Sequence, residues 1–254
     1  MTHHNADEHF NNKWDNASWW DEFYDKNKDD TLNIDRDPRY LIKTIEKINR
    51  RPPLKILDAG TGISTLPEFA AYLGHHVVAV DISPKAIETG KTRKVTEKDL
   101  MRCLGESYSC RYFQGKREYL DRETKKPVDI RMELNKLFHP WGELVAREVM
   151  DWNDSALIEK QGTFDIVLNQ NGLRAASPEL ITKSFQSFYR LLNPGGILIE
   201  TNIIALDRLE RLEQQAIAAG FRVLTESWVV FGIESLKVEL NDTEKYALFG
   251  WPTG

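Results

Sequence analysis

The sequence has few cysteines, no long apolar run and no excess of positive charge, and each shortage argues against a class of protein. Its 254 residues include only Cys103 and Cys110, and a pair with this spacing makes no zinc site without further ligands. Both are therefore interpreted as free thiols. No apolar run approaches about 18 residues and the amino terminus is polar, so we expect no membrane span, no signal peptide and a cytoplasmic location.

The charge balance of the chain bears on its partners. The formal net charge is −5 and the isoelectric point is about 5.8, whereas nonspecific binding to a nucleic-acid backbone needs a basic surface. A nucleic-acid substrate is therefore disfavoured. One local basic concentration leaves the question open, but acids at positions 118, 121 and 123 interrupt it, which favours a solvated face. Its basic members are Arg111, Lys116, Arg117, Arg122, Lys125 and Lys126.

Residues 54–83 carry the most informative pattern in the chain. A short apolar run, a turn with Gly60 and Gly62, a helix-like stretch and a second apolar run follow one another. The two apolar runs end at Asp58 and Asp81. This order of strand, glycine turn, helix, strand and acid is typical of a nucleotide site. The glycines let the backbone bend tightly and approach a ligand, and the second acid stands where a carboxylate can bind both hydroxyls of a ribose.

Two details separate the possible cofactors. A dinucleotide fingerprint has a third glycine, which would stand at position 65, but this chain has Thr65. Asp58, two residues before the first glycine, would repel a pyrophosphate and attract an ammonium group. An acid-x-Gly-x-Gly pattern followed by a strand-end acid resembles the class I S-adenosylmethionine-dependent methyltransferases, whose cofactor has an α-amino group and no phosphate. The resemblance implies S-adenosylmethionine as cofactor, bound by Asp58, Gly60, Thr61, Gly62, Asp81 and Ile82.

Simpler interpretations of the two acids remain open. Asp58 could cap the first helix of the pattern. Asp81 could cap the second helix, because Asp81-Ile82-Ser83-Pro84 offers a capping residue before a proline in the first turn.

Three downstream blocks follow in the order that the resemblance requires. The third strand would end in Asp151 and Trp152, which would lie at the adenine of the cofactor. Residues 163–172 would form the fourth strand, with Asn169 at its carboxyl end beside the transferring methyl group and in contact with the cofactor. Residues 191–203 would supply the end of a helix, a Pro-Gly-Gly turn and the fifth strand.

The implied fold is α/β, a Rossmann-like doubly wound sheet of seven strands whose last strand is antiparallel. Residues 207–219 form an amphipathic helix that Gly220 ends, and the runs FRVLTESWVVF and KYALFGW supply strands six and seven. Residues 1–52 are interpreted as an amino-terminal helical lid segment and residues 53–254 as the methyltransferase core. Within the core, an inserted subdomain at about residues 91–142 lies between strands two and three.

The insertion and the amino-terminal segment have patterns of their own. In the insertion, YSCRYF and REYL, separated by QGK, predict a hairpin, ETKKPVD a turn, and residues 131–138 a short helix. Asp37-Pro38 predicts the start of an amphipathic helix in the amino-terminal segment. Residues 10–24 are rich in aromatic side chains, which suits a movable lid over the methyl-transfer site, although large aromatic residues also serve as packing anchors. The tryptophans, the insertion and the chain length are also distantly similar to thiopurine methyltransferases.

The chemistry expected from the resemblance is a direct in-line methyl transfer, which needs alignment and desolvation more than acid-base groups. The catalytic residue is not identified; acceptor-site candidates are Asn169, Asn171, Arg174, Tyr24, Tyr40 and His139. No metal is predicted, because the fourth strand ends in Asn-Gln-Asn where catechol-type relatives have a metal-binding aspartate. A calcium-loop-like stretch over residues 25–36 likewise has Asp30 and Arg36 where the template needs glycine and glutamate.

The sequence therefore predicts a methyltransferase that acts on a small-molecule acceptor. Two alternatives remain: a protein or RNA methyltransferase that docks its substrate through the insertion, and a noncatalytic cofactor-binding protein on the same fold. The acceptor atom and the oligomeric state are not determined by the sequence.

Overall fold

The computed structural model describes most of the core and parts of the amino-terminal segment and the insertion. The described residues are 16–26, 53–92, 108–113, 116–129, 132, 144–170, 172–173, 176–201, 206–224 and 246–250. The helix expected from Pro38 lies outside them, as does the helix expected over 131–138 apart from residue 132. The candidates Tyr40, His139, Asn171 and Arg174 also lie outside the described residues.

The core is a seven-stranded sheet with the strand order β6-β2-β1-β7-β8-β10-β9. Every strand pairing in this sheet is parallel. The Rossmann-like α/β class expected from the sequence is confirmed by this central parallel sheet. The strands are β1 (Lys55–Ala59), β2 (His76–Asp81), β6 (Val145–Val149), β7 (Phe164–Gln170), β8 (Leu192–Thr201), β9 (Arg222–Leu224) and β10 (Tyr246–Gly250).

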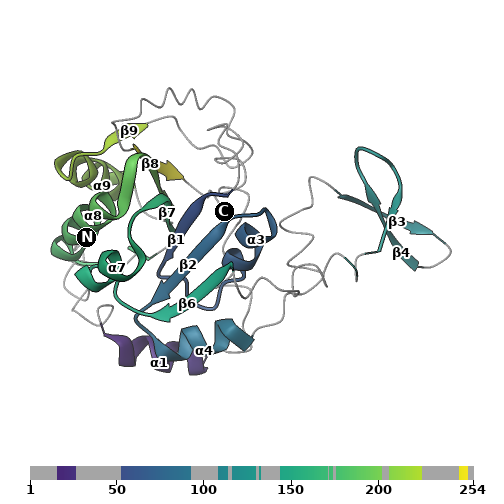
Figure 1. The fold of residues 1–254 in the computed structure, drawn as a ribbon, viewed down its shortest axis with the longest axis horizontal. Coiled ribbons are helices and arrows are strands. Elements are labelled where there is room, and N and C mark those ends of the chain that lie inside the picture. The colour runs from purple at the N-terminus through teal and green to yellow at the C-terminus, as the bar shows by residue number, and fades with distance from the viewer. Residues whose placement is uncertain are drawn as a thin grey trace, which may run out of the picture.

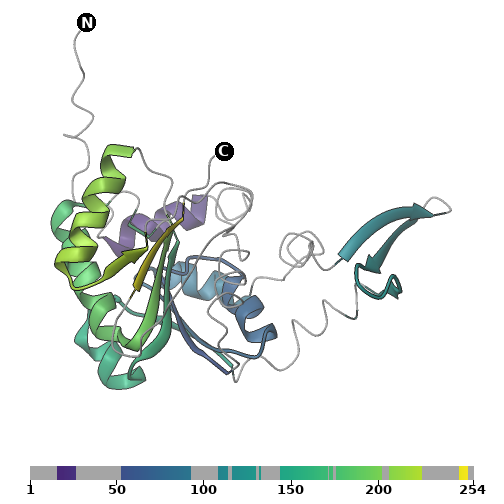
Figure 2. The same ribbon diagram turned by 90° about the horizontal axis from the view of Figure 1, so that it is seen from above.

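Helices cover both faces of the sheet, as Figures 1 and 2 show. One face carries α3 (Leu66–Tyr72) and α4 (Pro84–Thr92), and α1 (Ala17–Lys26) packs against α4. The other carries α7 (Ser155–Gln161), α8 (Pro178–Leu191) and α9 (Leu206–Ala218). The central strands are continuous apolar runs in the sequence because a parallel sheet that is covered on both faces buries most side chains of its central strands.

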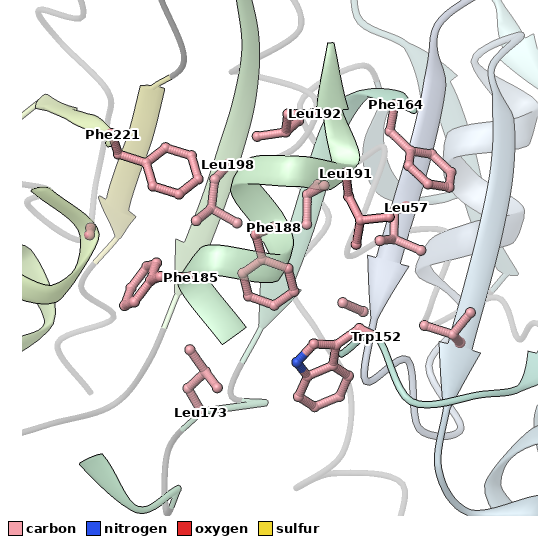
Figure 3. Packing of buried hydrophobic residues seen from close by; sticks show 14 of the residues in the cluster. Leu57, Trp152, Phe164, Leu173, Phe185, Phe188, Leu191, Leu192, Leu198 and Phe221 are labelled. Atoms are coloured by element: carbon pink, nitrogen blue, oxygen red, sulfur yellow. The ribbon is translucent and has the colours of Figure 1, made fainter. Parts of the chain in front are cut away.

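The side chains of successive strand residues divide between the two faces. Leu57, Val167 and Leu198 join the large buried cluster beneath α7, α8 and α9, where they pack with Phe185 and Phe188 of α8 (Figure 3). The residues directly before and after these three in each strand therefore point to the opposite face of the sheet, toward α3 and α4. This alternation decides which polar residues at the strand ends share a face.

The order of the strands fixes the position of the ligand crevice. From β1 the chain builds outward through β2 and β6, and it then returns to the other side of β1 to add β7 and β8. In open α/β sheets ligands bind outside the carboxyl ends of the strands at the point where the direction reverses. The carboxyl ends of β1 and β7 therefore mark the expected site.

The prediction of an antiparallel last strand was wrong, because β10 pairs in parallel with both β8 and β9. Residues 225–245 connect β9 to β10 and lie outside the described residues. Two parallel strands must begin at the same end of the sheet, so the chain has to cross back between them. A connection of this length is long enough for that crossover, whereas a short hairpin is not. The antiparallel expectation came from the family resemblance and not from the local sequence.

The Pro-Gly-Gly segment lies within β8 and not before it. Leu192 pairs with Phe164, and the next paired residues are Ile197 and Ile166, so β8 has three more residues than β7 between the two pairings. Gly195 has a φ of +71°, which suits a bulge of this kind. Helix α8 ends immediately before β8, at Leu191.

The inserted subdomain forms a second, three-stranded sheet in the order β3-β4-β5. Its strands are β3 (Tyr108–Phe113), β4 (Lys116–Asp121) and β5 (Pro127–Val128), and the antiparallel pairing of β3 with β4 confirms the predicted hairpin. In both views this small sheet lies apart from the main sheet (Figures 1 and 2). In the turn after β4, hydrogen bonds from the backbone and side chain of Thr124 lower the pKa of Asp121.

Among the described residues, no helix is both long and apolar enough to cross a membrane.

Candidate functional site

The glycine turn between β1 and α3 is tightly enclosed. Gly60 and Gly62 have φ values of +68° and +56°, a region that other residues rarely adopt. Side chains would also collide, because a Cβ at Gly60 would lie 3.0 Å from the Trp152 ring and one at Gly62 would lie 2.6 Å from the Tyr24 hydroxyl oxygen. The Thr61 amide between them donates to the carbonyl of Val80 (2.9 Å), which ties the turn to β2. Both glycines are therefore required by backbone conformation and by close neighbours.

Asp58, the last polar residue of β1, binds a side chain of this turn. Its side chain is almost fully buried, and Oδ2 accepts a hydrogen bond from the Thr61 hydroxyl (2.6 Å). The N-cap of α3 is Thr65, whose side chain makes no cap hydrogen bond, and the Leu66 amide at the start of the helix donates to the Ser64 hydroxyl (3.1 Å). The structure thus does not support the interpretation of Asp58 as a cap of the first helix. A buried carboxylate at this point favours a positively charged ligand group.

Asp81, at the carboxyl end of β2, binds two separate backbone segments. Oδ2 accepts from the Gly62 amide (2.8 Å) and Oδ1 from the Ser83 amide (2.9 Å). The Ser83 hydroxyl, not Asp81, caps the first turn of α4, because it accepts from the Ala86 amide (3.0 Å). The carboxylate therefore links the glycine turn to the β2–α4 turn at the edge where the resemblance expects a ribose.

Helix α1 lies over these two turns. Tyr24 is buried with Ile63 and Ala86, and Trp20 and Phe23 pack against this small cluster. The described part of the predicted lid is thus a helix packed beside the glycine turn; residues 10–15 lie outside the described residues. Tyr24, a catalytic candidate from the sequence, forms a wall of the site with its hydroxyl oxygen close to Gly62.

Asp151 and Trp152 follow β6 but have different surroundings. The Asp151 side chain is exposed, and its Oδ1 accepts from the Asn153 amide (2.8 Å). The Trp152 indole points into the core, where its N–H donates to the Ser184 hydroxyl (3.0 Å) and its ring lies near Phe188 (Figure 3). Asp151 is therefore accessible to a ligand, whereas the Trp152 side chain supports the turn at Gly60 from behind.

Asn169 and Gln170 end β7 and point to opposite faces. Asn169 is fully buried on the face of Val167, and its Nδ2 donates to the Ala59 carbonyl (3.3 Å). Gln170, which is 3% exposed, lies two residues after Leu168, the partner of Asp58, and so shares the Asp58 face. The sequence prediction singled out Asn169. The period-two alternation along the predicted strand was the signal that could have identified Gln170.

Arg147 on β6 is a second residue that the sequence prediction missed. Its guanidinium is buried beneath the glycine turn and binds the Glu68 carboxylate through Nε (3.1 Å) and Nη2 (2.8 Å). Nη2 also donates to the Ser64 carbonyl (2.6 Å). Arg147 therefore joins an edge strand to the first turn of α3 and to the loop before it. In the sequence, the one feature that could have identified Arg147 was its position as a charged residue inside the predicted strand VAREV.

The described residues contain no group of three or more histidine, cysteine, aspartate or glutamate side chains arranged to hold a metal ion. His75 precedes β2 at the opposite end of the sheet from the site, where its Nδ1 accepts from the Leu54 amide (3.2 Å). Burial, and then the nearby charge of His76, lower the pKa of His75. The neutral ring is thus held as a structural acceptor.

Comparisons with known proteins place the chain near solved methyltransferase structures only at low similarity. No protein-family model and no curated protein matches it. A TehB-like S-adenosylmethionine-dependent methyltransferase from Corynebacterium glutamicum is 15% identical over 81% of this chain and 83% of that one, with a TM-score of 0.45. Magnesium protoporphyrin IX methyltransferase from Synechocystis, solved with bound S-adenosylmethionine, is 15% identical over 61% of this chain, with a TM-score of 0.39.

A methyltransferase from Agrobacterium tumefaciens is likewise 15% identical over 71% of this chain and 48% of that one, with a TM-score of 0.43. The matched part of the chain spans about half of the Synechocystis protein, 52% of its length. Similarity at this level carries no argument about activity, which rests on the residues of the chain itself.

Proposed function

We propose that this protein is an S-adenosylmethionine-dependent methyltransferase that transfers a methyl group to a small-molecule acceptor in the cytosol. The observation that carries the proposal is the glycine turn enclosed by two buried carboxylates, Asp58 and Asp81. Two negative charges beside the turn favour a cofactor with cationic groups over one with a pyrophosphate. Thr65 stands where a dinucleotide site has its third glycine and is itself buried, which further disfavours a dinucleotide.

The residues present fit this cofactor at three points. Asp81 lies at the carboxyl end of β2, where its carboxylate accepts the Gly62 and Ser83 amides and would also accept the ribose hydroxyls. Asp58 supplies the negative charge that the α-amino group needs. Asp151, which is exposed and follows β6, would accept the adenine amino group, as the family resemblance predicts. The cofactor, when bound, supplies the methyl group and its own leaving group.

The protein's own contribution is alignment and exclusion of water. Tyr24 and the other aromatic residues of α1 cover the glycine turn, and this cover lowers the access of water to the reacting atoms. Gln170 lies at the carboxyl end of β7, on the Asp58 face, where its amide can orient an acceptor. Asn169, by contrast, acts from the core by holding the Ala59 carbonyl. His139, Asn171 and Arg174 remain candidates for the acceptor side.

Calorimetry tests the proposal directly. We expect S-adenosylmethionine and S-adenosylhomocysteine to bind to the wild-type protein, and nicotinamide dinucleotides to give no heat of binding. The physical reason is the charge of the turn, which attracts an ammonium group and repels a pyrophosphate. Tight binding of a dinucleotide together with no heat from S-adenosylhomocysteine would overturn the proposal.

Replacement of the strand-end acid tests the predicted ribose contact. In Asp81→Ala, loss of charge-assisted hydrogen bonds worth roughly 1.5–3 kcal/mol should weaken S-adenosylhomocysteine binding about ten- to hundredfold. Asp165→Ala is the matched control, because Asp165 also accepts a backbone amide, that of Lys55 (2.9 Å), but lies at the amino end of β7, at the opposite end of the sheet from Asp81. The control should lose about 1 kcal/mol or more of stability but no affinity. If wild type and a folded Asp81→Ala variant bound S-adenosylhomocysteine with equal affinity, Asp81 would not contact the cofactor.

A further inference from the structure

Helix α1 contacts both backbone segments that hold the Asp81 carboxylate. One oxygen of Asp81 accepts from Gly62 in the glycine turn, and the other accepts from Ser83 in the β2–α4 turn. Each of these two residues also meets a side chain of α1. The predicted ribose acid and the helix that covers the site are therefore connected at two points.

The first connection is polar and passes through Ser83. The Ser83 hydroxyl donates to Oδ1 of Asp21, and the same oxygen accepts from the Lys85 amide (3.1 Å). Because Ser83 also caps α4 and donates its own amide to Asp81, it lies between two carboxylates. A carboxylate beside the first turn of α4 is stabilised by the helix dipole, so Asp21 is an effective anchor for α1.

The second connection is steric and lies at Gly62. The Tyr24 hydroxyl oxygen is so close to Gly62 that a Cβ there would stand 2.6 Å from it. Tyr24 is buried with Ile63 of the glycine turn and Ala86 of the first turn of α4. When α1 is docked, Tyr24 thus confines the turn whose amide binds the second oxygen of Asp81.

We propose that Asp21 is a positioning residue that couples the docking of α1 to cofactor binding through Ser83 and the Asp81 carboxylate. The inference rests on the proposed function, because the ligand of Asp81 is the ribose of the cofactor. Docked α1 holds both amides at the carboxylate and so orients it for the ribose hydroxyls. By linkage the effect is reciprocal, and a bound cofactor stabilises the docked helix by the same free energy.

The neighbouring acid on α1 provides a matched control. Asp25 lies one helical turn after Asp21 and also approaches α4, but within the described part of the chain its carboxylate meets only the Lys85 ammonium, at 3.9 Å. Both side chains of that pair are substantially exposed, and such pairs contribute little. Asp25→Ala removes the same charge from the same helix without touching Ser83. Asp21→Asn, in turn, removes the charge but keeps an oxygen that can accept from Ser83.

The closing experiment measures S-adenosylhomocysteine affinity by calorimetry in wild type, Asp21→Ala, Asp21→Asn and Asp25→Ala. We expect Asp21→Ala to bind about three- to tenfold more weakly, Asp21→Asn to recover part of the loss, and Asp25→Ala to match wild type. Wild-type affinity in a folded Asp21→Ala would overturn the coupling while leaving the proposed function intact. A wild-type protein that does not bind S-adenosylhomocysteine would instead overturn the proposed function and the coupling with it.

Hydrogen exchange separates coupling from a merely structural role. S-adenosylhomocysteine should slow amide exchange in residues 17–26 of wild type and of Asp25→Ala, and much less in Asp21→Ala at saturating ligand. Exchange in β10, at the far side of the sheet, should change little in any variant. Equal ligand-induced protection of α1 in wild type and Asp21→Ala would contradict the proposal even if the variant were less stable.

Discussion

Gly62→Ala is expected to undock α1 and to weaken S-adenosylhomocysteine binding more than about tenfold. An alanine at a φ of +56° costs about 1–3 kcal/mol of backbone strain. The new Cβ would also stand 2.6 Å from the Tyr24 hydroxyl oxygen, a collision that costs about a further 1–3 kcal/mol. Because the same residue donates to Asp81, displacement of the turn disturbs the predicted ribose contact as well. Urea denaturation measures the loss of stability, and calorimetry measures the loss of affinity for S-adenosylhomocysteine.

Two further variants separate strain from collision. Gly162→Ala places alanine at a comparable φ of +67°, but the nearest atom to its Cβ is the Lys55 ammonium nitrogen, at 3.9 Å. This control should lose stability from strain alone and keep its affinity. In Gly62→Ala with Tyr24→Phe, the hydroxyl is gone and the nearest remaining Tyr24 ring atom is 3.4 Å away, so part of the affinity should return. If the double variant binds no better than Gly62→Ala, Tyr24 is not the obstacle.

Arg147→Met should destabilise the protein by about 2–4 kcal/mol, because removal of one partner of a buried ion pair leaves the other without compensation. The Arg147 side chain is 3% exposed and that of Glu68 is 22%, so water relieves part of the penalty at Glu68. The Ser64 carbonyl also loses its donor. Since Ser64 follows the glycine turn, cofactor affinity should fall together with stability. Urea denaturation gives the first quantity and calorimetry with S-adenosylhomocysteine gives the second.

The control for this variant is another ion pair of the same strand. Lys160 meets Glu148 of β6 at 2.9 Å, but the lysine side chain is 57% exposed. Lys160→Met should therefore cost less than about 1 kcal/mol and leave affinity unchanged. Similar losses in the two variants would show that the Arg147 pair contributes no more than a surface pair.

The local sequence was sufficient to predict the elements that build the site. An apolar run, two glycines, a helical spacing and a second apolar run appear in the structure as β1, the turn, α3 and β2. Such patterns are informative because backbone conformation and burial act over a few residues at a time. The hairpin of the insertion was predicted on the same basis, from two β-rich runs separated by a short connection. The last strand was predicted wrongly because its direction depends on a long connection and on its neighbours.

By itself, the sequence determined the order of strand, glycine turn, helix and strand over residues 55–81, and that Asp58 and Asp81 stand at strand ends. Only the tertiary structure decided what those acids contact, because their partners are distant in the chain. Asp21 is 62 positions from Ser83, and Arg147 is 79 positions from Glu68. The tertiary structure also decided that Gln170, and not Asn169, lies on the Asp58 face of the sheet. It decided as well that the Trp152 indole points into the core. The physical reason is that contacts between distant segments depend on packing and sheet register, which no local pattern specifies.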